Sequence, residues 1–277
     1  MSLTIGSGPL SPEAAGTFNA SLGLPERVLL FDPYLPRVRA LFEGETVVDS
    51  LRTRLLHETG CLPLFYFPLA DVRQDLLEPS AKSVDVPAKG RASYRSLQVG
   101  DRKAPDAAWV FEEPVAEAAF LSDHVAFEWG ALDEWFTEDE QVFGHPRDPY
   151  SRIDVLKSTR HVRVSLRGEL LAESRRPKIL YETALPPRFY LPPEDVRTEL
   201  FVASPARTRC AYKGSASYWH VQIGDRLVED LVWTYRDPQH DAKPVADHLC
   251  FFNERVDLEV DGEPMERPRT QWSLDED

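Results

Sequence analysis

The sequence predicts a mainly β protein that contains two tandem copies of one domain, each of roughly 100 residues. Three observations support this prediction: an internal repeat, a series of short segments in which apolar and polar residues alternate, and 23 prolines among 277 residues. Proline lacks the N–H that a helix interior or a central strand uses, so its abundance favours short strands and loops. Small antiparallel sheets fit this pattern better than one parallel α/β sheet.

The repeat becomes visible when the chain is shifted by 124 positions, without any gap. Glu58 then falls on Glu182, Lys89 on Lys213 and Trp109 on Trp233. Between residues 38 and 127, roughly a third of positions are identical in this register, which chance does not produce over so long a stretch. The sequence therefore predicts an N-terminal arm (1–26), a first repeat (27–132), a connector that packs across both repeats (133–158), a second repeat (159–266) and an acidic tail (267–277).

Each copy is expected to consist of short strands rich in aromatic and β-branched residues. In the second copy the predicted strands are 162–166, 179–183, 217–223 and 231–235. Gly224-Asp225 predicts a hairpin turn, because glycine tolerates the positive φ that such turns need. The segment from Pro193 to Leu200 predicts one short helix, since proline and acids open it and apolar Val196 and Leu200 follow at helical spacing.

The net charge of -14 argues against nucleic acid and anionic lipid as partners, because such a surface repels phosphates. No run of about 18 apolar residues predicts a membrane span, and the first 20 residues do not resemble a secretory signal. Three cysteines without CxxC spacing predict neither a disulfide framework nor a cysteine-based zinc site. We therefore expect a cytoplasmic protein with reduced thiols, no cofactor and no metal. Nothing in the sequence defines an oligomeric state.

The densest polar segment, 208–218, contains Cys210, Tyr212, Lys213 and Tyr218. A neighbouring ammonium favours the thiolate, so Cys210 is the candidate for a catalytic nucleophile. The alternative is a partly buried cysteine at the head of a strand, with Lys213 reaching solvent. The first copy keeps Lys89 but has valine and alanine where Cys210 and Tyr212 stand. A reaction based on cysteine is therefore expected in the second copy only.

Glu58 and Glu182 each follow apolar residues in a predicted strand. A carboxylate on an apolar face needs a partner, and the lysine of the same copy, Lys89 or Lys213, is the simplest one. A structural ion pair and a role in ligand binding or acid–base chemistry both remain open for these glutamates.

Other candidates carry aromatic rings or a cation. Arg188 and Tyr190 could recognise an anion or a ring, and the first copy has Leu64 and Tyr66 at these positions; Tyr94 is the counterpart of Tyr218. The tyrosines between prolines, Tyr66 and Tyr190, could equally pack in a core. Trp109 and Trp233 are either core aromatics or walls of a ligand pocket.

The second copy carries a motif that runs from Glu182-Thr183 through Pro187-x-Phe189-Tyr190 and Lys213-Gly214 to Trp233-x-Tyr235. This motif resembles the DUF427 family, a domain of unknown function, and the whole chain resembles its tandem, two-domain members. The resemblance implies a β-tent fold, in which two small antiparallel sheets lean together around a cleft for a small ligand. The family has also been labelled nucleotidyltransferase-like. That chemistry needs paired carboxylates for magnesium, but Leu227 stands where the second acid is required after Asp225.

The predicted function is binding of a small anionic or aromatic ligand in the cleft of each repeat. The expected linings are Glu182, Arg188, Tyr190, Cys210, Tyr212, Lys213, Tyr218 and Trp233 in the second repeat, and Glu58, Tyr66, Lys89, Tyr94 and Trp109 in the first. One alternative is a hydrolase or transferase that uses Cys210 with Lys213 and Glu182. A further alternative is a protein-interaction module.

Overall fold

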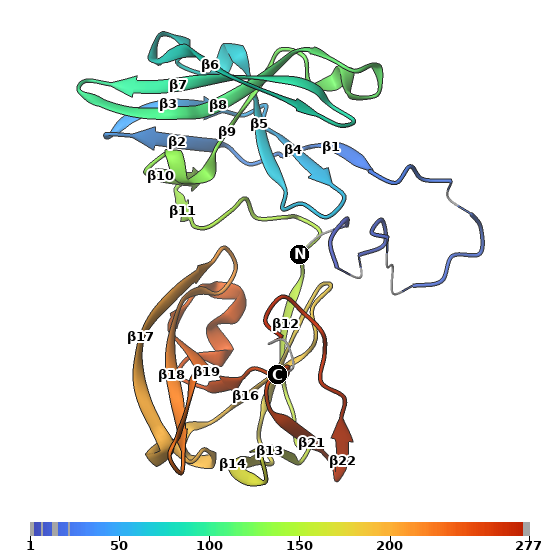
Figure 1. Cartoon of the computed structure of the whole chain (residues 1–277), viewed down its shortest axis with the longest axis vertical. Helices are drawn as coiled ribbons and strands as arrows, with labels where there is room; N and C mark the ends of the chain where they lie inside the picture. Colours follow the sequence, from blue (N-terminus) through green and yellow to red (C-terminus); the bar gives the residue numbers. More distant parts are fainter. Residues whose placement is uncertain (1–2, 7, 13–15, 22, 274–277) are drawn as a thin grey trace. The chain divides into compact units, whose positions relative to one another are not determined.

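The computed structural model describes residues 3–6, 8–12, 16–21 and 23–273. The chain forms two compact units, Met1–Tyr150 and Ser151–Asp277 (Figure 1). Each unit contains one seven-stranded and one four-stranded antiparallel sheet, which confirms the predicted mainly β tandem repeat. The remaining residues of the N-terminal arm and residues 274–277 of the acidic tail lie outside the described residues.

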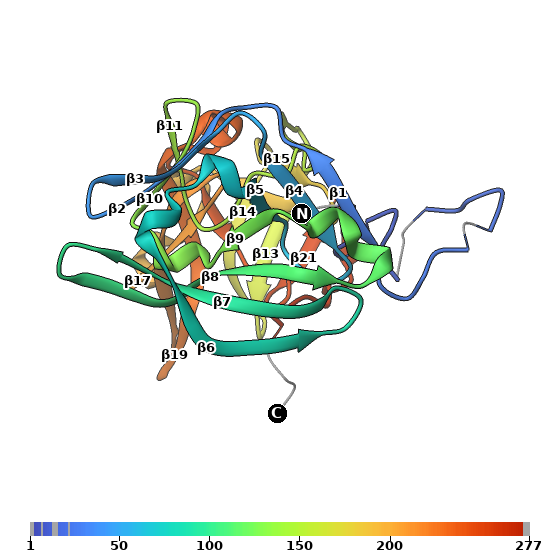
Figure 2. The same ribbon diagram turned by 90° about the horizontal axis from the view of Figure 1, so that it is seen from above.

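The first unit has sheets in the order β1-β4-β5-β9-β8-β7-β6 and β11-β10-β2-β3. Its strands are β1 (Leu29–Pro33), β2 (Val38–Phe42), β3 (Glu45–Ser50), β4 (Arg54–Glu58), β5 (Leu64–Pro68), β6 (Leu77–Val86), β7 (Gly90–Val99), β8 (Arg102–Pro114), β9 (His124–Phe127), β10 (Glu134–Thr137) and β11 (Glu140–Val142). The long strands β6, β7 and β8 lie side by side (Figure 2).

The second unit repeats this topology with sheets β12-β15-β16-β20-β19-β18-β17 and β14-β13-β21-β22. Its strands are β12 (Ile153–Lys157), β13 (Val162–Leu166), β14 (Glu169–Ser174), β15 (Lys178–Glu182), β16 (Arg188–Leu191), β17 (Phe201–Cys210), β18 (Gly214–Ile223), β19 (Arg226–Pro238), β20 (Leu249–Phe251), β21 (Asp257–Val260) and β22 (Glu263–Met265). The predicted strands correspond to β13, β15, β18 and β19, although β15 ends at Glu182, one residue before the predicted end. The predicted hairpin turn is confirmed by Gly224, which joins β18 to β19 with a φ of 55°.

The single helix predicted over 193–200 is wrong. The structure has two 3₁₀ turns there, η5 (Pro193–Asp195) and η6 (Thr198–Leu200), separated by Val196 in an extended conformation. Val196 forms an isolated β-bridge with Ala172, and the N–H of Arg197 donates to Leu171 O at 2.9 Å. These long-range backbone bonds compete successfully with the local helical preference. The first unit has the same pair of turns, η1 (Leu69–Asp71) and η2 (Gln74–Leu76).

The segment predicted as a connector supplies strands to both units. β10 pairs with β2 in the four-stranded sheet of the first unit, as β21 pairs with β13 in the second. β12 pairs with β15 in the seven-stranded sheet of the second unit. That the connector also packs across both repeats stays a prediction.

Each seven-stranded sheet has apolar side chains on both faces. In the second unit, one face forms the inner core together with β13, β14 and β21. The opposite face forms the outer core, defined by Leu180, Tyr190, Ala216, Trp233, Tyr235, Cys250 and two residues of the 3₁₀ segment η7 (His240–Val245). The first unit has a corresponding outer core, against which η3 (Ala116–Leu121) packs. None of the helical segments in the described part of the chain combines the length and hydropathy that a membrane span needs.

Candidate functional site

The outer face of the large sheet in the second unit gathers most of the predicted site residues. Side chains alternate along a strand, so Glu182 shares the face of Leu180, and Tyr218 shares that of Ala216. Tyr190 and Trp233 lie in the outer core itself. Glu182, Tyr190, Tyr218 and Trp233, which are distant in the sequence, are therefore brought to one face.

A buried ion pair joins the glutamate and the lysine in each unit. Lys213 Nζ donates to Glu182, and Lys89 Nζ donates to Glu58. The Lys213 and Glu182 side chains are 13% and 6% exposed, so both charges are largely removed from water. This confirms the ion pairing predicted from the sequence. Burial by itself would lower the pKa of the Lys213 ammonium, but attraction to Glu182, aided by Cys210, raises the pKa above its ordinary value and keeps the charge.

The tyrosine and tryptophan candidates form an equivalent core pair in each unit. Trp233 Nε1 donates to Tyr190 Oη at 3.1 Å, and Trp109 Nε1 donates to Tyr66 Oη at 3.3 Å. Tyr190 is 1% exposed, and burial raises the pKa of its phenol well above the ordinary value. The structure thus places Tyr66 and Tyr190 as packing residues whose hydroxyl groups are satisfied internally.

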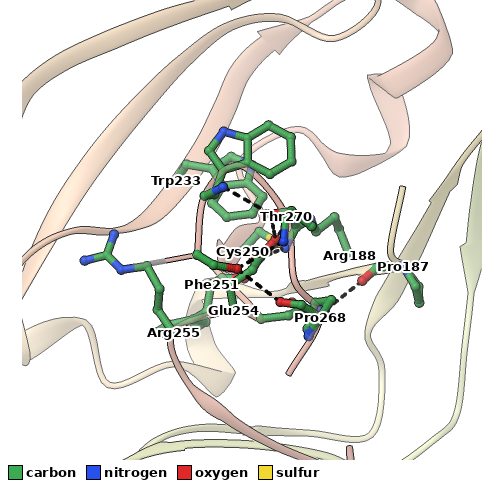
Figure 3. Close-up of polar contacts among 12 residues, drawn as sticks. Pro187, Arg188, Trp233, Cys250, Phe251, Glu254, Arg255, Pro268 and Thr270 are labelled. Carbon is green, nitrogen blue, oxygen red and sulfur yellow. Dashed lines mark hydrogen bonds and ion pairs between the residues drawn. The ribbon is translucent and has the colours of Figure 1, made fainter. Parts of the chain in front are cut away.

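Arg188 has its anionic partner within the protein (Figure 3). Its guanidinium donates to both carboxylate oxygens of Glu254 at 2.7 Å. The rings of Trp233 and Trp272 lie 5.6 and 5.4 Å from the guanidinium carbon. Thr270 Oγ1 donates to Glu254 Oε1 at 2.6 Å, so residues of the predicted tail complete the cluster. Burial opposes ionisation of Glu254, but the bonds from Arg188 and Thr270 outweigh it and lower the pKa.

Sequence reasoning missed Glu254 and Trp272. For Glu254, a comparison of the two copies could have indicated the pairing with Arg188. The first copy has Leu64 where Arg188 stands and Gly130 where Glu254 stands. Both members of the pair differ together, as expected for two residues in contact. Cys250, also in this cluster, is fully buried, and burial raises the pKa of its thiol. Cys250 is thereby suited to packing and not to nucleophilic chemistry.

One part of the outer face is less buried, at the edge strand β17. We call it the open rim and define it by Thr208, Cys210, Lys213 and Tyr218. Cys210 is half-buried, and its Sγ accepts the N–H of Tyr212 at 3.5 Å. The hydroxyl groups of Thr208 and Tyr218 are 2.7 Å apart. Tyr212 itself is only 3% exposed and belongs to the packing beneath the rim.

The first unit fills the matching region with its own side chains. Lys82 places its ammonium 4.0 Å from the ring centroid of Tyr94, and Arg27 adds a second cation to Glu58. The second unit has alanine at the position of Lys82 and serine at that of Arg27. The rim of the second unit therefore keeps the Glu–Lys pair but lacks both covering cations.

No three His, Cys, Asp or Glu side chains among the described residues come close enough together to hold a metal ion. The fold and this face together define a class of protein. It consists of tandem β units, each with two sheets and a buried Glu–Lys pair beside an aromatic outer core. The chain belongs to the DUF427 family, a domain of unknown function, whose model matches residues 31–138 and again 154–262. No curated protein matches the chain.

Proposed function

We propose that the protein binds a small anionic or aromatic molecule at the open rim of its second unit. The observation that carries this proposal is the difference between the two rims: Lys82 covers Tyr94 in the first unit, whereas Ala206 stands there in the second. The Tyr218 ring is only half-buried and offers a stacking surface. Lys213 has three N–H donors, of which Glu182 uses one, so an anionic group can share the others.

The proposal assigns different roles to the predicted residues. Tyr218, Thr208 and Lys213 contact the ligand, and Glu182 holds Lys213 in place. Tyr190, Trp233 and Arg188 support the floor of the rim through their internal bonds. In the first unit, Glu58, Lys89, Tyr66, Tyr94 and Trp109 keep the fold but bind no ligand.

Protection of Cys210 from alkylation tests this proposal. The probe is salicylate, an aromatic anion, and the readout is the rate at which iodoacetamide labels each cysteine in the full chain. We expect salicylate to slow labelling of Cys210 and to leave that of Cys61, a half-buried thiol of the first unit, unchanged. Tyr218→Ala should remove the protection. Equal protection of both thiols, none at any concentration, or protection that survives Tyr218→Ala would refute the proposal.

A second candidate function, acyl transfer or hydrolysis by Cys210, is favoured by the N–H of Tyr212 directed at its sulfur and by the nearby ammonium of Lys213. In such a step the thiolate attacks an ester carbonyl, the alcohol leaves, and water then cleaves the thioester. With p-nitrophenyl acetate, we expect a burst of one p-nitrophenolate per chain that Cys210→Ser abolishes and Cys61→Ser retains. A burst unchanged in Cys210→Ser would exclude this candidate.

A further inference from the structure

A groove lies on the opposite face of the same large sheet in the second unit. Its volume is about 540 Å3, within the range of roughly 300–1,000 Å3 typical of small-molecule sites. The lining residues include Phe201 of β17, Trp219 of β18 and Thr234 of β19. The Trp219 and Phe201 ring centroids are 6.2 Å apart, and together they give the groove an aromatic wall.

Two opposite charges also line the groove, Arg236 and Asp247. β19 pairs with β20 in the register Val232↔Phe251 and Trp233↔Cys250, and Asp247 lies two residues before β20. The N–H of Asp247 donates to Tyr235 O at 3.0 Å, which holds Asp247 beside the end of β19 that carries Arg236. Within the described part of the chain, neither side chain takes part in an ion pair. The groove thus presents one cation and one anion, both unpaired, beside an aromatic wall.

In the first unit, two of the corresponding positions carry charged side chains that face each other. Arg95 replaces Trp219 and Glu112 replaces Arg236. The two side chains approach each other, with Arg95 Nη2 3.9 Å from Glu112 Oε1. Val110 also replaces the groove threonine, Thr234. The first unit therefore lacks both the aromatic wall and the free cation, and only the second unit offers them to a ligand.

From this arrangement we infer that the groove binds a zwitterionic, amino-acid-like molecule with a flat apolar side chain. The ligand carboxylate pairs with Arg236, because a guanidinium matches a carboxylate with two N–H donors. The ligand ammonium pairs with Asp247, and the side chain lies on Trp219 and Phe201. A plain anion would meet repulsion from Asp247, and a plain cation repulsion from Arg236, so the pair selects a molecule with both charges.

Titration of the full chain with L-phenylalanine, followed by saturation-transfer NMR and calorimetry, tests the inference. We expect saturable binding, and weaker binding by about tenfold for 3-phenylpropionate, which lacks the ammonium, and for phenethylamine, which lacks the carboxylate. Arg236→Gln should weaken L-phenylalanine by about tenfold or more. Asp247→Asn should reduce the preference for L-phenylalanine over 3-phenylpropionate; asparagine tolerates the φ of 58° at this position, so the turn is kept.

Two control variants separate this site from others. Glu112→Gln changes the equivalent position of the first unit and should leave binding unchanged. Tyr218→Ala alters the open rim and should also leave it unchanged, so this experiment and the salicylate experiment can fail independently. Absence of saturable L-phenylalanine binding below about 10 mM, or binding that Arg236→Gln and Asp247→Asn both leave intact, would overturn the inference.

Discussion

The outer faces of the two units share a buried Glu–Lys ion pair but differ in the residues around it. In the first unit Glu58 meets two cations, Lys89 and Arg27, and Lys82 covers the nearby Tyr94 ring. In the second unit Glu182 pairs with Lys213, and the adjoining positions carry a thiol and small residues. The buried pair therefore belongs to the fold of the domain, whereas the rim around it is free to diverge.

A second contrast between the two outer faces concerns the positions of Arg188 and Glu254. The second unit buries Arg188 against Glu254, with side-chain exposures of 8% and 0%. The first unit has leucine and glycine at these positions and no such pair. The Arg188–Glu254 pair, unlike the Glu–Lys pair, is therefore not needed for the fold, and in the second unit it holds Thr270 and Trp272 against the sheet.

Arg188→Leu should cause the largest loss of stability in either unit. It leaves the Glu254 carboxylate buried without its main partner, and we expect the free energy of unfolding of the second unit to fall by about 3–5 kcal/mol. Urea denaturation of the full chain, followed by tryptophan fluorescence, measures the midpoint of that transition. The double variant Arg188→Leu/Glu254→Gln removes both charges and should recover much of the loss. A double variant as unstable as the sum of the two single changes would contradict this view.

Removal of the lysine that both units share tests the first contrast. Lys213→Met leaves Glu182 without a cation, and we expect a loss of about 3 kcal/mol at pH 7.5. Lys89→Met should cost about 1 kcal/mol less, because Arg27, although 45% exposed, still pairs with Glu58. Denaturation curves for both variants, and for Arg27→Gln combined with Lys89→Met, decide the matter. Equal losses for the two single variants would show that Arg27 contributes nothing.

The sequence predicted the features that occur in both copies of the repeat, namely the strands and the Glu–Lys pairs. Short runs rich in aromatic and β-branched residues located the strands, and the two Glu–Lys pairs followed from the need of each buried carboxylate for a partner. The helix over 193–200 failed because Val196 bonds to Ala172, a long-range contact that no local pattern encodes. The groove charges, Arg236 and Asp247, escaped notice because each is an ordinary surface residue until the fold brings both to the same groove.

The first unit should show a pH effect from its buried His57, a position that is Tyr181 in the second unit. His57 is fully buried, its Nδ1 lies 3.6 Å from Asp148 Oδ2, and its ring nitrogens form no hydrogen bond within the described residues. Burial lowers the pKa of His57 and outweighs attraction to Asp148 and Asp32. The folded state therefore holds the neutral imidazole, while the unfolded chain takes up a proton near the ordinary pKa of about 6.5.

The sign of this effect follows from proton uptake on unfolding. The contribution of neutral His57 to the free energy of unfolding is fully present above pH 6.5. It falls as the pH drops toward the lowered pKa of His57, by at most about 1.4 kcal/mol per pH unit. Denaturation midpoints of the first unit between pH 7.5 and 5.5 measure it. In His57→Phe we expect this part of the slope to vanish, while the slope from carboxylates remains. The same slope in both proteins would show that His57 does not titrate on unfolding.

The smallest expected effect concerns the cation over Tyr94. Lys82→Ala should lower the stability of the first unit by about 0.5–1 kcal/mol, the usual worth of an exposed cation–π contact. The reverse change, Ala206→Lys, supplies the missing cation beside Tyr218 and should reduce salicylate protection of Cys210 by blocking the ring. Lys82→Ala thus tests the covering cation through the stability of the first unit, and Ala206→Lys tests it through the access of salicylate to the second. If Ala206→Lys left salicylate protection unchanged, the covering cation would not be what distinguishes the two rims, and the binding contrast would have to rest on the Cys210 segment alone.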